Sequence, residues 1–167
     1  ERQIIAIAQR LILIILCIGF SYSQRIPVAL FEPVVITSEQ QSRIDALDSL
    51  AGKSVEQQHE LAMLYASTRA FEQSFDILSS LAEEDPENYD YQFMLGGIAG
   101  ILASEVSQVK SLPYVRAMKT AFEQAARIAP DSLTIQLVLL ELYSELPWVL
   151  GGSNKKAKKA LSAVQSL

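Results

Sequence analysis

The chain has 167 residues, half of them hydrophobic, with 14 Lys and Arg against 19 Asp and Glu. This length and composition indicate a single domain with a sizeable core and exclude a disordered tail. The net charge of −5 argues against nucleic-acid binding, because phosphates would be repelled and the one lysine cluster has no interleaved aromatic residue.

The first 23 residues have the layout of a secretory signal peptide. The apolar run over 11–20 is shorter than the roughly 20 residues that a membrane-spanning helix needs. Small residues stand one and three places before a cut after Ser23, as signal peptidase requires. We therefore expect residues 1–23 to be removed and the protein to be periplasmic or secreted. A retained membrane anchor is the alternative, since the apolar stretch reaches back to Ile4.

An extended linker is predicted over residues 24–37, where two prolines and a β-branched run break helical periodicity. A helical domain is expected from 38 to 167. Its first helix should be capped by Ser38 and stop at Gly52. The apolar face of that helix should contain Ile44, Leu47, Leu50 and Ala51.

Three helical hairpins follow in the apolar pattern. Pro86 and Pro130 each end a hairpin and are 44 residues apart. An inserted loop is predicted at Ser104–Pro113, and Leu146–Ser153 is predicted to be a shaped turn. The expected helix pairs are 55–68 with 71–82, 89–103 with 114–129, and 133–145 with 154–167.

These units resemble the tetratricopeptide repeat family over roughly residues 53–167. That family has a period of about 34 residues, which is why the second unit is expected to carry the insertion. In that family, the first helix of each unit carries an apolar residue, then a small residue, then an aromatic residue one turn later. The corresponding residues here are Leu61, Ala62 and Tyr65, then Leu95, Gly96 and Ala99, then Leu139, Leu140 and Tyr143.

The resemblance implies an all-α fold, a right-handed solenoid of antiparallel hairpins with about three repeats and an N-terminal capping helix. One departure is that Gln58, Gln92 and Gln136 stand where the family has a bulky aromatic residue. The segment from Lys110 to Leu161, with Ala-Pro-Asp and then Leu-Pro-Trp-Val-Leu-Gly-Gly-Ser, is similar to exported bacterial tetratricopeptide repeat proteins that carry a Pro-x-x-x-Gly-Gly turn. A tight helix crossing is expected at a run of small residues, namely Gly96, Gly97, Ala99, Gly100 and Ala103.

The family geometry places one face of each first helix on the concave side, which is the predicted binding face. The alternative is that these side chains only pack between helices. The predicted binding residues are Glu56, His59, Met63, Asp90, Phe93, Gly97, Thr134, Leu137 and Glu141.

Trp148 is a tenth candidate, as an exposed anchor for a partner. We favour the alternative that its side chain folds back onto the repeats. The lysines at 155, 156, 158 and 159 are interpreted as the polar face of the last helix, opposite Ala157, Leu161 and Val164.

No catalytic or metal site is predicted. His59 is the only histidine, and Cys17, the only cysteine, lies in the segment expected to be removed. Zinc needs three or four ligands, so His59 is interpreted as a surface or groove side chain. A carboxylate cluster at the first Asp-Pro turn is expected to be solvated; it comprises Glu83, Glu84, Asp85, Glu87 and Asp90.

The sequence thus predicts a scaffold without cofactor or catalytic activity that binds a protein or peptide through its concave face. It predicts no nucleic-acid partner and no membrane contact beyond an uncleaved N-terminal segment, and it leaves the oligomeric state open. The alternative is a small-molecule binding component of a transporter, with a pocket closed by Ser104–Pro113 and Leu146–Ser153.

Overall fold

The computed structural model describes residues 35–166. The predicted signal peptide and most of the predicted linker lie outside these residues. The described part is all-α, as predicted, with seven α-helices, one short 3-10 helix and no strand. The elements are α2 (Ser38–Asp48), α3 (Val55–Ser67), α4 (Phe71–Glu84), α5 (Tyr89–Glu105), α6 (Gln108–Ile128), α7 (Leu133–Glu145), η2 (Trp148–Leu150) and α8 (Asn154–Ser166).

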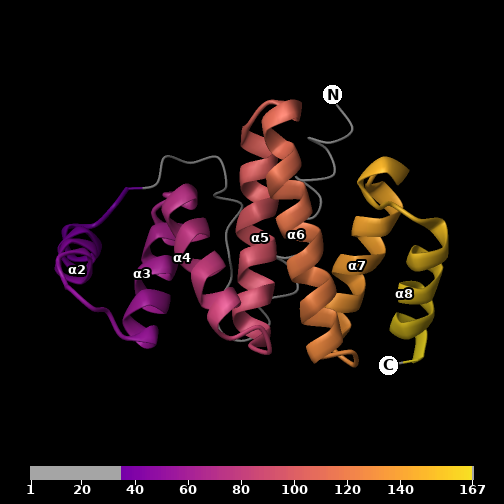
Figure 1. Ribbon diagram of the computed structural model, residues 1–167, viewed down its shortest axis with the longest axis horizontal. Coiled ribbons are helices and arrows are strands. Elements are labelled where there is room, and N and C mark those ends of the chain that lie inside the picture. The colour runs from indigo at the N-terminus through magenta and orange to yellow at the C-terminus, as the bar shows by residue number, and fades with distance from the viewer. Residues whose placement is uncertain (1–34, 167) are drawn as a thin grey trace.

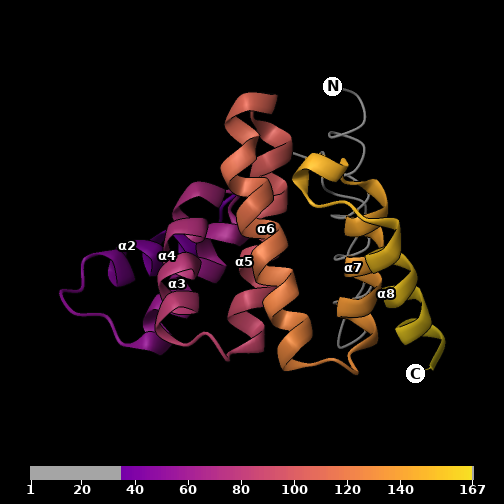
Figure 2. The same cartoon turned by 45° about the vertical axis from the view of Figure 1, so that its right-hand side comes forward.

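The helices stand side by side in chain order, from α2 at one end of the row to α8 at the other (Figure 1). Each helix packs mainly against the helices before and after it in the sequence. The paired helices are α3 with α4, α5 with α6 and α7 with α8, and the turned view in Figure 2 shows the long α5–α6 pair extending beyond its neighbours.

The two N-terminal helices begin at capping boxes. The Thr37 hydroxyl accepts the Gln40 backbone N–H at 3.1 Å, and Ser54 accepts that of Gln57 at 3.3 Å. Thr37, not Ser38, is therefore the N-cap of α2. The predicted apolar face of α2 is correct only at Ile44 and Leu47, because the helix ends at Asp48 and leaves Leu50 and Ala51 exposed.

The predicted inserted loop at Ser104–Pro113 is wrong. Helix α5 continues to Glu105 and α6 begins at Gln108, so the additional residues lengthen both helices. Pro113 is the sixth residue of α6, where it lacks the N–H that would bond to the carbonyl of Val109 in the first turn and its ring crowds that carbonyl. The Val109 side chain is 80% exposed, so this turn lies at the surface and tolerates the proline.

One turn geometry occurs twice. Asp85 ends α4 with φ −128° and ψ 81°, and Ala129 ends α6 with φ −125° and ψ 71°. The N-cap residues of the next helices, Asn88 and Ser132, have φ/ψ of −80°/109° and −76°/111°. The cap residues on both sides of these two turns therefore have closely similar backbone dihedral angles.

Three glutamines near the starts of α3, α5 and α7 donate to backbone carbonyls in the segments before these helices. Gln92 Nε2 donates to the carbonyls of Ala82 at 3.2 Å and Pro86 at 3.4 Å. Gln136 Nε2 donates to the carbonyl of Pro130 at 2.8 Å, and Gln58 Nε2 to that of Lys53 at 3.3 Å. Each glutamine thus satisfies a carbonyl that the preceding helix or loop leaves without a helical partner.

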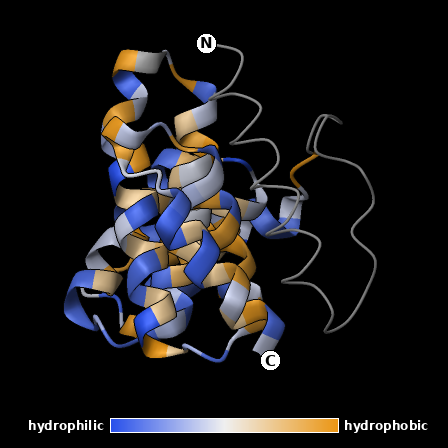
Figure 3. Cartoon of the chain, turned by 90° about the vertical axis from the view of Figure 1, so that its right-hand side faces the viewer, coloured by the Kyte–Doolittle hydropathy of each residue, from blue (hydrophilic) through white to orange (hydrophobic). Residues whose placement is uncertain are grey.

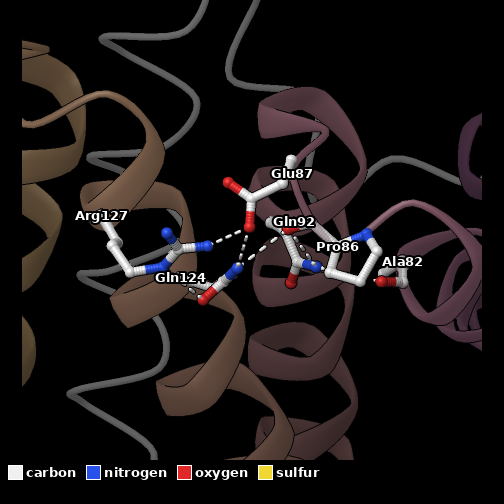
Figure 4. A network of polar contacts seen from close by, with 6 residues as sticks. All are labelled: Ala82, Pro86, Glu87, Gln92, Gln124 and Arg127. Carbon is white, nitrogen blue, oxygen red and sulfur yellow. Dashed lines mark hydrogen bonds and ion pairs between the residues drawn. The ribbon is translucent and has the colours of Figure 1, made fainter.

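The first of these turns is also tied to the following hairpin (Figure 4). Gln124 of α6 donates to the Pro86 carbonyl at 2.9 Å. Arg127 pairs with Glu87 and donates from Nε to Gln124 Oε1 at 3.2 Å. The other members of the predicted carboxylate cluster at this turn are exposed, as expected.

The predicted tight helix crossing lies between α5 and α6. A Cβ atom on Gly96 would lie 2.6 Å from the ring of Phe122, which is fully buried. A Cβ atom on Gly100 would lie 3.2 Å from the sulfur of Met118. Only a residue without a side chain at position 96 lets the Phe122 ring pack against the α5 backbone.

We expect Gly96→Ala to lower the free energy of unfolding by about 1–2 kcal/mol, because overpacking against a rigid buried ring outweighs the gain in helix propensity. Gly100→Ala is the matched control. It should be neutral or stabilising by up to about 1 kcal/mol, since the Met118 thioether can move aside. Urea unfolding followed by circular dichroism measures both variants. Equal stability of the two variants would contradict the assigned contact, as would an unchanged cost of Gly96→Ala in a Phe122→Leu background.

Candidate functional site

The predicted binding residues occupy equivalent positions on α3, α5 and α7, counted from the three turn-binding glutamines. Glu56, Asp90 and Thr134 precede their glutamine by two residues. His59, Phe93 and Leu137 follow it by one. Met63, Gly97 and Glu141 follow it by five. These three triplets are hereafter called the first-helix face.

The first-helix face is only partly accessible. Glu56, Asp90 and Met63 are exposed, whereas the other six residues are partly buried. The Glu56 carboxylate accepts the Ser54 hydroxyl at 2.8 Å, and this hydrogen bond lowers the pKa of Glu56. Glu56 is therefore a charged side chain at the N-terminus of α3, where the helix dipole also favours an anion.

His59 lies between two helices. Its ring centroid is 5.3 Å from that of Tyr91 on α5, and its Nε2 atom is buried without a hydrogen-bond partner among the described residues. Within residues 35–166 no group of three or more His, Cys, Asp and Glu side chains is placed to hold a metal ion. His59 therefore contributes an aromatic contact between α3 and α5.

Phe93 is a packing residue. Its ring stacks on Tyr89 at 5.6 Å and tilts against Phe122 at 5.8 Å. It borders the apolar cluster that α7 closes. Phe93 therefore packs between helices, whereas Met63 is accessible. The two interpretations of the first-helix face thus apply to different residues.

Trp148 does not fold back onto the repeats, and the expectation that favoured this role is wrong. Its side chain is 84% exposed. It lies beyond the C-terminal end of α7 at Glu145, whereas Thr134 lies in the first turn of that helix, about 17 Å from Glu145 at 1.5 Å per residue. Trp148 thus lies at the opposite end of α7 from Thr134.

The turn that carries Trp148 is tightly hydrogen-bonded. The backbone N–H groups of Leu150 and Gly152 both donate to the Pro147 carbonyl, at 2.9 and 3.1 Å. Gly151 has φ +98°, and a Cβ atom on Gly152 would lie 1.7 Å from the Leu146 oxygen. The Gly-Gly pair is therefore required by the backbone path.

A polar network that the sequence did not reveal lies between α6, α7 and α8. The Glu123 carboxylate accepts the Tyr143 hydroxyl at 2.7 Å and Lys156 Nζ at 2.9 Å, and Lys119 Nζ lies 3.6 Å from it. Lys156 also lies 5.0 Å from the centre of the Tyr143 ring. The three helices are distant in the sequence, so only a register between α6 and α8 could have predicted this cluster.

The network stabilises the ionised state of Glu123. Burial alone would raise the pKa of Glu123, but the hydrogen bonds from Tyr143 and Lys156 and the charge of Lys119 together hold it below its usual value. Burial, and then the hydrogen bond to Glu123, raises the pKa of Tyr143. The network therefore joins the last three helices with the carboxylate charged and the phenol neutral.

The lysines of α8 are exposed, as the sequence predicts. The apolar side of this helix differs from the expectation. Ala157 and Ala160 are buried, Val164 is half-buried and Leu161 is 41% exposed. Helix α8 therefore packs on its neighbours through small residues and leaves a larger apolar side chain accessible.

Comparison with known proteins identifies no relative: no family model, no curated protein and no solved structure matches this chain.

We expect Glu123→Gln to destabilise the protein by about 1 kcal/mol or less near neutral pH, a modest value because the pair is partly exposed. The folded-state pKa of Glu123 is lowered, so its stabilisation is present above the unfolded-state pKa and is lost as the pH falls through the folded-state value. Thermal melts from about pH 3 to pH 7 should therefore converge for the wild type and the variant at the acid end. Glu84→Gln, an exposed change of the same kind, should show no such pH-dependent difference. A constant difference at all pH values would contradict the charged state assigned to Glu123.

Proposed function

We propose that this chain is a tetratricopeptide-like solenoid that holds a protein or peptide and carries out no catalysis. The observation that carries the proposal is the repeated hairpin with its glutamine-bound turn. Stacked copies of one hairpin leave equivalent residues of successive first helices along a shared surface, which is how solenoid proteins form extended binding faces. A right-handed solenoid with a concave first-helix face is part of this proposal.

The charge distribution supports a cationic partner. Residues 35–105 contain 13 acidic and three basic residues. Two of the three basic side chains, Arg43 and Arg69, lie in ion pairs with Glu60 and Glu105. Glu56 and Asp90 on the first-helix face thus stand in an acidic half of the protein, which attracts Lys and Arg side chains and repels acidic segments.

The same face offers one accessible apolar contact, Met63, which is 39% exposed. A flexible thioether adapts to differently shaped apolar side chains. The partner that fits these features is a peptide segment in which basic residues flank an apolar side chain. The small-molecule alternative is less well supported, because Ser104–Pro113 is almost entirely helical and does not form a closing loop.

We further propose that the protein acts after export to a periplasm or the cell exterior, on the basis of the apolar run and the Ser-Tyr-Ser site in residues 1–23. None of the helices in residues 35–166 combines the length and apolar character needed to cross a bilayer.

The export proposal predicts a mature N-terminus at Gln24. Edman sequencing or intact mass measurement of the protein expressed with its N-terminal segment in a secreting bacterium checks this. Substitution of Ser23 by a large residue, as in Ser23→Tyr, should block the cut, because signal peptidase needs a small residue there. A wild-type product that kept residues 1–23 and sedimented with membranes would establish the anchor alternative.

The binding proposal predicts that Glu56→Lys with Asp90→Lys weakens binding of a cationic peptide at least tenfold, or about 1.4 kcal/mol. The probe is a set of fluorescein-labelled peptides of about 12 residues with Lys and Arg around a central Leu or Phe, read by fluorescence anisotropy. The matched control is Glu72→Lys with Glu83→Lys, the same change of charge at exposed positions of α4. An equal loss in both double variants would show attraction by net charge alone and contradict the assignment to the first-helix face.

A further inference from the structure

Two helices of the row cover the preceding hairpin in the same way. Helix α5 contributes Leu95 and Ile98 to the apolar cluster that contains Ala62 and Leu78 of the α3–α4 hairpin. Tyr91, which contacts His59, borders that cluster together with Met94. The residues with which α5 covers the α3–α4 hairpin are thus Tyr91, Met94, Leu95 and Ile98.

Helix α7 repeats this arrangement one hairpin later. Its covering residues share a cluster with Phe122 of α6, and Tyr89 and Phe93 of α5 pack against that cluster. The Tyr89 hydroxyl lies 3.4 Å from the Ser132 hydroxyl at the start of α7. Counted from Gln92 and Gln136, the covering positions of α5 and α7 are identical. In α7 these residues are Ile135, Val138, Leu139 and Leu142.

The last hairpin also has a groove, between α7 and α8, and no helix of the described part of the chain covers it. On α7, Leu133 and Leu137 occupy the positions that Tyr89 and Phe93 occupy on α5, and Leu133 is exposed. The groove between α7 and α8 has a volume of about 260 Å³. Hereafter called the end groove, it is lined by Leu140, Ser144, Asn154, Ala157, Lys158 and Leu161.

The end groove lies at the open end of the row, where α8 is the outermost described helix (Figure 1). Figure 3 faces this end and shows hydrophilic and hydrophobic segments next to each other on the ribbon. Leu161 and Lys158 of α8 both line the groove, and both side chains are exposed. The surface therefore combines an apolar floor with a cationic rim.

The net charge of the C-terminal part of the protein indicates which kind of partner the end groove attracts. Residues 106–166 contain eight basic and four acidic residues, and α8 itself has four lysines and no carboxylate. Lys156 is paired with Glu123, whereas Lys155, Lys158 and Lys159 have no ion pair within residues 35–166. A second α8 from another copy would be repelled, and an acidic helix would be attracted.

We propose that the end groove binds an amphipathic helix of a partner protein, one that carries carboxylates beside an apolar stripe with the spacing of Ile135, Val138, Leu139 and Leu142. Helices bind such grooves through apolar anchors on one face. This site is separate from the first-helix face and does not depend on the function proposed for that face.

The probe is a synthetic peptide with the sequence of α7, residues 133–145, extended by glutamates for solubility. It has the covering stripe, two carboxylates in Glu141 and Glu145, and no basic residue. We expect the full chain to bind it in fluorescence anisotropy, and a peptide with Val138→Asp and Leu142→Asp not to bind. Failure of the full chain to bind the unmodified peptide overturns the proposal.

Variants of the protein locate the site. Lys158→Glu and Leu161→Asp should each weaken binding at least tenfold, whereas Lys159→Glu, the same charge change outside the groove lining, should alter it less than about twofold. Circular dichroism checks that each variant remains folded, and Lys158→Glu alters only an exposed side chain. Equal loss with Lys158→Glu and Lys159→Glu means nonspecific charge attraction and overturns the proposal.

Two further measurements separate other outcomes. Glu56→Lys with Asp90→Lys should not weaken binding of the acidic helix, so failure at the first-helix face and failure at the end groove are distinguishable. Sedimentation of the full chain tests whether the occupant is a second copy. A dimer that Leu161→Asp dissociates would overturn the proposal in favour of self-association through this groove.

Discussion

The backbone carbonyl of Pro86 links the first hairpin to both helices of the next hairpin. A turn that ends a helix leaves carbonyl groups that the helical ladder does not satisfy, and burying them without donors is costly. The Pro86 oxygen accepts from Gln92 on α5 and from Gln124 on α6. Because the two donors come from both helices of the next hairpin, satisfying one carbonyl positions that hairpin against the one before it.

The close approach of α5 and α6 likewise helps to position the next helix, α7. The backbone at Gly96 receives the ring of Phe122, and this ring also contacts Phe93. Phe93 in turn borders the cluster that α7 completes. A glycine in one helix therefore sets the depth at which an aromatic ring sits, and that ring forms part of the floor on which the next helix packs. Polar and charged groups are left to the faces and ends of the row, acidic in the first half and basic in the second.

Much of the helical pattern could be predicted from the sequence, because apolar periodicity and prolines are local signals. The range predicted for α7 is the observed one, Leu133–Glu145. The inserted loop at Ser104–Pro113 was predicted wrongly because the 44-residue spacing of Pro86 and Pro130 shows that residues are added to the unit, but not whether they lengthen its loop or its helices. Trp148 was also misplaced, since the direction in which a turn projects its side chain depends on the backbone dihedral angles that Gly151 and Gly152 allow.

By itself, the sequence determined that the described part of the protein is all-α, where most of its helices begin and end, and that one hairpin turn is repeated. These properties follow from residue spacing and from the restrictions that proline places on the backbone. Only the tertiary structure decided that Phe93 packs while Met63 is accessible, that Glu123 joins Tyr143 to Lys156, and that α7 and α8 form a groove which no other helix of residues 35–166 covers. Each of these depends on how far one helix is rotated and shifted against another, and that is settled by packing between residues distant in the chain.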